Sequence, residues 1–149
     1  MKHKKVIFVC SGNTCRSPMA EAALKAELKK RRIAWFTITS AGLNAHVGAP
    51  MNPMAQQALT EAKISYSAMF KSKQLTREMV RDACLVICMT QEQAQAIGGK
   101  NVTSFFALAG REIPDPFGQS IDVYRATLRN IREYLPLIIE KLKSFEKEE

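Results

Sequence analysis

Short apolar runs alternate along the chain with segments whose apolar residues recur every three or four positions. Continuous apolar runs bounded by turn residues are typical of buried parallel strands, and the wider spacing is typical of helices. The pattern predicts strands at 6–10, 36–39, 85–89 and 102–106, and helices at 18–32, 52–62, 76–82, 91–97 and 121–145. Strands that alternate with helices form a parallel sheet covered on both faces. We therefore expect a single α/β domain over residues 1–149, with a four-stranded parallel sheet and helices on both faces.

Prolines and turn-forming residues mark three points in this pattern. Pro18 suits the first turn of a helix, with Ser17 as the N-cap just before it. The run Ser40-Ala41-Gly42 is expected to end the second strand. Pro136 interrupts the apolar stripe of the last helix, so we expect a kink or a break near Tyr134. The stripe itself is more typical of a helix that packs on its own sheet than of a coiled coil.

Composition and charge narrow the class of protein. The 149 residues are 46% hydrophobic and 7% aromatic, which is ordinary for a globular domain. The net charge of +8 permits an acidic partner. The basic clusters at 2–5 and 29–32 carry no interleaved aromatics, which favours a solvated surface over a nucleic-acid site. The apolar run 6–10 is too short for a signal peptide or a membrane span. We therefore expect a cytoplasmic protein that binds neither nucleic acid nor membrane.

Cysteine and histidine usage argues against cross-links and against a metal. A chain of this size without a secretory signal keeps its thiols free, and this applies to Cys10, Cys15, Cys84 and Cys88. The cysteines are spaced by five and four positions, and His3 and His46 flank neither pair in the pattern of a zinc site. No metal and no cofactor is therefore expected, and His46 is interpreted as a loop residue.

The most unusual stretch follows the first strand, at the edge of the sheet where α/β proteins bind ligands. Gly12 and Asn13 tolerate left-handed backbone, which turns successive N–H groups inward as an anion-binding nest beside the positive end of a helix. The guanidinium of Arg16 can donate two parallel hydrogen bonds to phosphate oxygens. Helix N-termini and cations favour thiolates, and a hydroxyl such as that of Ser17 can donate to the sulfur of Cys10. The loop reads Cys10-Ser11-Gly12-Asn13-Thr14-Cys15-Arg16-Ser17.

This loop supplies a nucleophile, a phosphate cradle and positive charge for a transition state. It lacks the G-x-G-x-x-G of dinucleotide sites and the Gly-Lys-Ser/Thr of Walker loops. A cysteine at the end of a strand is usually only a core residue. Arg16, six positions later in a loop that opens a helix, favours Cys10 as a nucleophile that accepts a phosphoryl group.

Residues 6–20, VIFVCSGNTCRSPMA, resemble the signature of the low-molecular-weight protein tyrosine phosphatase family. Thr39-Ser40-Ala41-Gly42 resembles the family's Ser-Ala-Gly stretch, and Asp115-Pro116-Phe117 resembles its Asp-Pro-aromatic loop. The resemblance covers nearly the whole chain. It implies a four-stranded parallel sheet flanked by helices, and an enzyme that hydrolyses phosphorylated proteins through a phosphate ester of Cys10.

The resemblance also assigns supporting and acid–base residues. It implies that residues 11–17 bind the phosphate and that Ser40 supports the loop asparagine. It further implies that Asp115 protonates the leaving group and later activates water. Without the resemblance, the sequence slightly favours Asp115 as a simple turn residue, and Asp122, itself more typical of a first helical turn, is the alternative acid. Lys73 lies near a position where many tyrosine-specific members carry arginine, and its role stays open.

Two residues separate the branches of the family. Thr14 and Phe117 resemble the protein arginine phosphatase branch, whereas tyrosine phosphatases usually carry an aliphatic residue and Tyr or Trp at these positions. A threonine can hydrogen-bond a tetrahedral phosphoramidate, while an aliphatic side chain would pack a flat phenol ring. Phosphoarginine in proteins is therefore the expected substrate, and phosphotyrosine is the alternative.

The second loop thiol and the type of activity each allow more than one interpretation. The resemblance implies a disulfide between Cys10 and Cys15 that protects the nucleophile from overoxidation, and packing is the second role considered for Cys15. A thioredoxin-coupled arsenate reductase shares this fold but needs two further cysteines on a flexible segment after the third strand, whereas Cys84 and Cys88 lie at or within the predicted strand, as core residues. A non-catalytic phosphoprotein-binding module is disfavoured because the nucleophile, arginine and acid are all present. A monomer is favoured.

Overall fold

The computed structural model describes residues 3–146, which form one four-stranded sheet and six helices. Along the chain these elements are β1 (Lys4–Cys10), α1 (Arg16–Lys30), β2 (Phe36–Gly42), α2 (Pro53–Glu61), α3 (Arg77–Asp82), β3 (Leu85–Cys88), α4 (Gln91–Ile97), β4 (Val102–Ser104), α5 (Phe105–Ala109) and α6 (Ile121–Glu146). The strands are all parallel, in the order β2-β1-β3-β4. The predicted fold class is confirmed.

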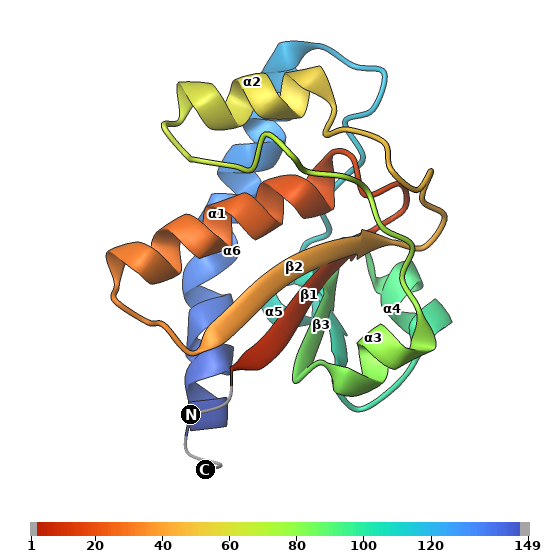
Figure 1. Ribbon diagram of the computed structural model, residues 1–149, viewed down its shortest axis with the longest axis vertical. Helices are drawn as coiled ribbons and strands as arrows, with labels where there is room; N and C mark the ends of the chain where they lie inside the picture. Colours follow the sequence, from red (N-terminus) through yellow and green to blue (C-terminus); the bar gives the residue numbers. More distant parts are fainter. Residues whose placement is uncertain (1–2, 147–149) are drawn as a thin grey trace.

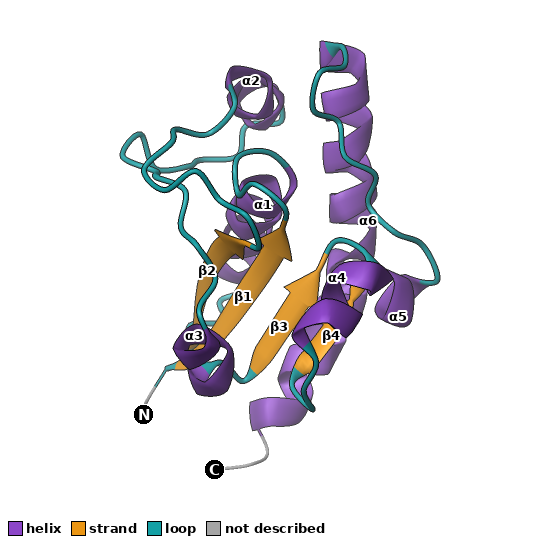
Figure 2. Cartoon of the chain, turned by 90° about the vertical axis from the view of Figure 1, so that its right-hand side faces the viewer, coloured by secondary structure: helices purple, strands orange, loops and turns teal. Residues whose placement is uncertain are grey.

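Helices cover both faces of the sheet (Figures 1 and 2). Side chains alternate along β1, so Val6 and Phe8 enter the larger core, which also holds buried residues of α1, α2, α5 and α6. Ile7 and Val9 point to the smaller core beneath α3 and α4. Burial on both faces explains why β1 reads as a continuous apolar run. Among residues 3–146, no helix is both long and apolar enough to cross a membrane.

The strand order reverses at β1, which lies between β2 and β3. The chain leaves β1 toward β2 on one side and later returns to form β3 on the other. Connections at the carboxyl end of the sheet therefore diverge at this point and leave a crevice. At the opposite, amino end of β1, the Lys4 ammonium donates to the carbonyl of Phe145 in α6 at 2.8 Å.

The first helix begins two residues earlier than expected, and Ser17 is not its N-cap. Cys15 occupies the cap position and makes no capping hydrogen bond with its side chain. Ser17 lies inside the first turn, fully buried, with its hydroxyl 2.9 Å from the sulfur of Cys10. The prediction was wrong because that hydroxyl is engaged by a tertiary contact in place of a helix amide.

The second strand does not stop at residue 40. Ser40, Ala41 and Gly42 pair with Phe8, Val9 and Cys10, so β2 extends to the end of β1. The extension requires glycine at its last position. A Cβ atom on Gly42 would lie 2.7 Å from the carbonyl oxygen of Ser11 and 3.0 Å from the amide nitrogen of Asn13.

The fourth strand is shorter than predicted, because residues 105 and 106 belong to a helix. Ser104 ends β4 and its hydroxyl accepts from the amide of Ala107 in the first turn of α5. The sequence analysis missed this five-residue helix because its apolar residues, Phe105 and Phe106, are also common in strands.

Of the kink or break predicted near Tyr134, the break is absent. The helix α6 runs from Ile121 to Glu146 with Pro136 inside it. Proline removes one main-chain donor from a helix. Buried side chains on both sides of the proline, including Leu135 and Ile138, hold the helix against the core and offset this loss.

We expect the substitution Gly42→Ala to lower the free energy of unfolding by about 1–3 kcal/mol, because the added methyl would overpack the main chain of the loop. Urea denaturation measures this change. The matched control is Gly12→Ala, where the nearest atom to an added Cβ is the hydroxyl of Thr14 at 3.8 Å. Equal effects of the two substitutions would contradict close packing at Gly42.

Candidate active site

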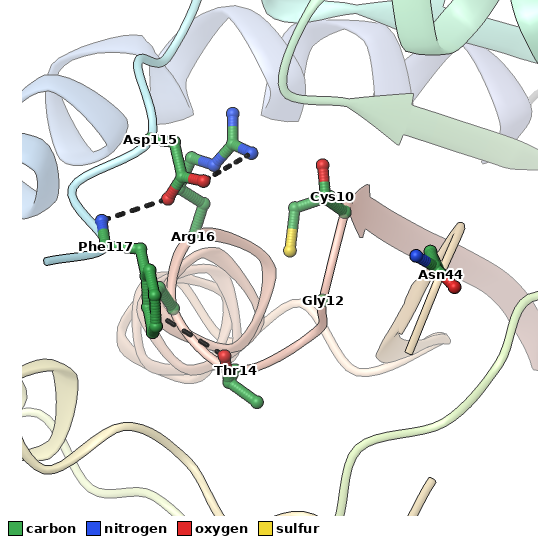
Figure 3. A pocket seen from close by; sticks show the side chains of 9 residues that line it. Cys10, Gly12, Thr14, Arg16, Asn44, Asp115 and Phe117 are labelled. Atoms are coloured by element: carbon green, nitrogen blue, oxygen red, sulfur yellow. Dashed lines mark hydrogen bonds and ion pairs between the residues drawn. The ribbon is translucent and has the colours of Figure 1, made fainter. Parts of the chain in front are cut away.

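The loop after β1 encloses a pocket at the carboxyl end of the sheet, with a volume of about 260 Å³. Figure 3 shows the thiol of Cys10 pointing into it, with Asp115, Arg16 and Phe117 on one side and Asn44 on the other. The residues that line it are Cys10, Ser11, Gly12, Thr14, Cys15, Arg16, Asn44, Asp115 and Phe117. The structure thus brings the three residues of the predicted chemistry, Cys10, Arg16 and Asp115, into one pocket.

Two donors converge on the sulfur of Cys10. The amide nitrogen of Asn13 lies 3.3 Å from the sulfur, and the hydroxyl oxygen of Ser17 lies 2.9 Å from it. Asn13 has a left-handed backbone with φ of 58°, which turns its N–H inward. Both contacts stabilise a thiolate, because each can donate a hydrogen bond to the negative sulfur.

The side-chain amide of Asn13 sets the direction of the hydrogen bonds around the loop. Its oxygen accepts from the main-chain N–H of Lys73 at 2.8 Å, which fixes the orientation of the amide. Its nitrogen therefore donates to Ser17 at 2.9 Å and to Ser40 at 3.0 Å. Because Ser17 accepts from Asn13, its own proton is free to point at Cys10. Ser40 in turn donates to Glu21 of α1 at 2.6 Å.

Residues 73–75, which follow α2 in the chain, supply the outer partners of this hydrogen-bond network. The main chain of residues 73–75 pairs with Gly42, whose N–H donates to the carbonyl of Lys73 while its own carbonyl accepts from Leu75. The role of Lys73, which the sequence left open, is structural. Its backbone N–H holds Asn13, and its ammonium donates to the hydroxyl of Thr39 on β2. His46 is exposed in the neighbouring loop, outside the pocket.

Arg16 and Asp115 lie against each other although they are far apart in the sequence. One guanidinium nitrogen of Arg16 donates to the carbonyl of Ile113 at 2.9 Å, and the other lies 3.8 Å from a carboxylate oxygen of Asp115. The second carboxylate oxygen accepts from the amide of Phe117 at 3.0 Å. The arginine side chain is 5% exposed and the aspartate 53%, so a fixed cation lies beside a solvent-accessible acid.

The alternative acid lies elsewhere. Asp122 is in the first turn of α6, where it forms an ion pair with Arg125 at 2.8 Å. It does not line the pocket.

The remaining thiols are distinguished by burial. Cys15 lies 3.4 Å from the hydroxyl of Tyr124 and 3.8 Å from that of Thr14, and burial raises the pKa of its thiol. Cys88 is the last residue of β3, where burial raises its pKa to about 12. Cys84 lies directly before that strand. None of the four cysteines forms a disulfide in the described part of the chain. Within residues 3–146, no group of three or more histidines, cysteines or acids is placed to hold a metal ion.

Several residues of the site escaped the sequence analysis. Asn44 lines the pocket from the loop after β2, and Gln93 of α4 donates to the hydroxyl of Ser11 at 3.3 Å. Glu21 and Tyr124 contact Ser40 and Cys15. None of the four stands in a local motif with the loop, so their roles depend on tertiary contacts that spacing does not reveal.

Comparisons with known proteins agree with this geometry. The sequence model described as "Low molecular weight phosphotyrosine protein phosphatase" matches residues 5–148. A protein-arginine-phosphatase from Bacillus subtilis is 37% identical over 147 residues, which cover 93% of this chain and 96% of the relative.

Two solved structures share the fold. A tyrosine phosphatase of low molecular weight from T. tengcongensis has a TM-score of 0.85 and 30% identity, covering 93% of this chain and 99% of that one. A cysteine-to-serine mutant of the YwlE arginine phosphatase, with a phosphorylated active-site serine, has a TM-score of 0.84 and 34% identity. That alignment covers 93% of this chain and 95% of the mutant.

Proposed function

The chain belongs to the low molecular weight phosphotyrosine protein phosphatase family and is a protein phosphatase, and we propose that it removes phosphoryl groups from arginine side chains of proteins. The observation that carries the chemistry is the position of the Cys10 sulfur. Cys10 lines the pocket together with Arg16, and its sulfur lies 3.3 Å from the amide nitrogen of Asn13 and 2.9 Å from the hydroxyl oxygen of Ser17.

In the first step the thiolate of Cys10 attacks phosphorus, and the bond from phosphorus to the guanidinium nitrogen breaks. The inward-facing amides of residues 11–17 and the fork of Arg16 stabilise the phosphate oxygens as charge redistributes. Asp115 gives its proton to the leaving nitrogen. Its exposed carboxyl group reaches the pocket, where its contact with Phe117 holds it in place.

In the second step water attacks the phosphorus of the cysteinyl phosphate. Asp115 takes the proton of that water, the sulfur–phosphorus bond breaks, and inorganic phosphate leaves. Ser17 donates to the sulfur and stabilises it as a leaving thiolate. The side chain of Asn13 acts indirectly, because it donates to Ser17 and so leaves the proton of that hydroxyl for Cys10, and Ser40 accepts from the same side chain.

The substrate is proposed from the rim of the pocket. Thr14 and Phe117 both line it, so the leaving group meets one hydroxyl and one aromatic ring. A hydroxyl that hydrogen-bonds a polar substrate disfavours substrates that lack the matching polar group. The similarity to the Bacillus subtilis protein-arginine-phosphatase supports the same choice.

Hydrolysis of phosphotyrosine is the second candidate. The Phe117 side chain is 69% exposed beside the pocket, so its ring is available to pack on a phenol. The matched family carries phosphotyrosine in its description, and several relatives are tyrosine phosphatases.

We expect Thr14→Ile to shift the preference of the enzyme toward phosphotyrosine by about 30-fold, because the loss of one hydroxyl contact and the gain of apolar area are each worth on the order of 1 kcal/mol. The measurement is kcat/KM for peptides that carry phosphoarginine or phosphotyrosine in the same sequence. In the unaltered protein the phosphoarginine peptide should be preferred. An unchanged ratio in the variant would remove Thr14 as the selective residue.

The same peptide assay distinguishes a phosphatase from a binding module and from an arsenate reductase. A phosphoprotein-binding module would bind both peptides and release no phosphate. An arsenate reductase would need Cys84 and Cys88, which the proposed mechanism does not use. Protection of Cys10 by a disulfide to Cys15, the cytoplasmic location and the monomeric state stay predictions.

A further inference from the structure

A second depression adjoins the catalytic pocket. It is an open groove of about 670 Å³, lined by Gln91, Phe106, Gly110, Arg111, Glu112 and Pro114. The helices α4 and α5, which supply part of its walls, lie beside each other at one side of the molecule (Figure 2). Pro114 lines the groove and the next residue, Asp115, lines the pocket, so one short segment of chain borders both depressions.

The groove holds two exposed charged side chains of opposite sign, Arg111 and Glu112. Arg111 is exposed, and within the described part of the chain it has no carboxylate partner. Glu112, beside it, is already engaged, because its carboxylate accepts from the amide of Gln91 at 2.7 Å. The guanidinium is therefore left to pair with an anionic group of a ligand, and the anionic side chains of an unmodified protein are carboxylates.

An exposed apolar side chain, that of Phe106, lines the same groove as Arg111, and hydrogen bonds hold the main chain beside them. Phe106 is 49% exposed, although it is a large hydrophobic residue on a short helix. The segment beneath is anchored, since the amide of Ile113 donates to Met89 at 3.0 Å and its carbonyl accepts from Arg16. A groove that needs no rearrangement binds an extended chain with less entropic cost.

We propose that this groove binds the stretch of a protein substrate next to its phosphorylated residue, with Arg111 facing a substrate carboxylate and Phe106 facing an apolar side chain. The inference rests on the proposed function. A phosphorylated side chain that enters the pocket leaves its own main chain at the rim, and the segment from Asp115 to Pro114 leads from the pocket to the groove. The enzyme then prefers sites flanked by an acidic and an apolar residue.

The test compares Arg111→Glu and Phe106→Ala with a charge-matched control, Lys29→Glu, on an exposed residue of α1. The substrates are para-nitrophenyl phosphate, which has no flanking chain, and phosphorylated peptides in which one Glu or one Lys is moved along the flanks.

For the peptide whose glutamate gives the lowest KM with the unaltered protein, Arg111→Glu should raise KM about three- to tenfold. This range lies between the contribution of a solvent-exposed ion pair and that of a desolvated, hydrogen-bonded one. The lysine peptide should recover most of this loss. Phe106→Ala should raise KM for both peptides, and neither variant should change turnover of para-nitrophenyl phosphate.

Equal changes from Arg111→Glu and Lys29→Glu, or no change with any peptide, would overturn the groove as a substrate site while leaving the phosphatase proposal intact. A second copy of this chain in the groove would give concentration-dependent mass in light scattering that Phe106→Ala abolishes, and this would also overturn it. If the unaltered protein hydrolysed neither para-nitrophenyl phosphate nor the peptides, both proposals would fail together.

Discussion

Replacing Cys10 by serine should reduce phosphatase turnover by a factor on the order of 10⁴ to 10⁶, which is the loss seen when an enzyme's nucleophile is removed. The serine hydroxyl is not ionised near neutral pH and is a far weaker nucleophile than a thiolate held by Asn13 and Ser17. Initial rates with para-nitrophenyl phosphate measure the effect.

The same variant should keep its affinity for anions. The amides of the loop and the guanidinium of Arg16 do not depend on the sulfur, so calorimetry with inorganic phosphate should give a dissociation constant close to that of the unaltered protein. Cys84→Ser, outside the pocket, is the control and should retain full turnover. Full activity in the Cys10 variant would exclude the covalent mechanism. Mass spectrometry adds a second readout, because a serine that accepts the phosphoryl group should hold it.

Replacing Arg16 by lysine is expected to lower kcat/KM by about 10³-fold or more, comparable to the contribution of other arginines that stabilise a transferring phosphoryl group. Arg16 is anchored through one nitrogen to the carbonyl of Ile113, which leaves the rest of the fork directed toward the pocket. A lysine has a single nitrogen, so it cannot hold that carbonyl and also bind two phosphate oxygens.

The control for this experiment is Arg125→Lys. Arg125 also uses a fork, since two of its nitrogens donate to Glu61 at 2.7 Å, but it joins α2 to α6 away from the pocket. Kinetics with para-nitrophenyl phosphate should distinguish the two variants clearly. Near-normal turnover in the Arg16 variant would contradict its role in stabilising the transition state.

The sequence predicted the parts of the fold that periodicity determines. The four strands and the order of the long helices follow from apolar patterns, and all of them are present. The errors lie where a tertiary contact outweighs a local preference. Ser17 has the side chain of a cap but binds Cys10, and Gly42 has the character of a turn but pairs with β1.

For the site, the sequence pointed to the side chains of the proposed chemistry but not to the main-chain groups that hold them in place. Cys10 and Arg16 stand in one loop, and Asp115 was found through the family resemblance. Main-chain groups left no such signal. The carbonyl of Ile113 holds Arg16, and the amide of Lys73 holds Asn13. Any amino acid could supply that carbonyl, and any amino acid except proline could supply that amide, so neither residue type reveals the contact.

The contact between Lys4 and Phe145 has a practical consequence for attaching this protein to a surface or to a reporter. Both residues lie at the amino end of β1, whereas the pocket lies beyond its carboxyl end, roughly 20 Å away along the seven-residue strand. A tether or fluorescent partner joined next to either residue would leave the mouth of the pocket open to bulky protein ligands. Immobilised binding assays should therefore be built from that end of the molecule.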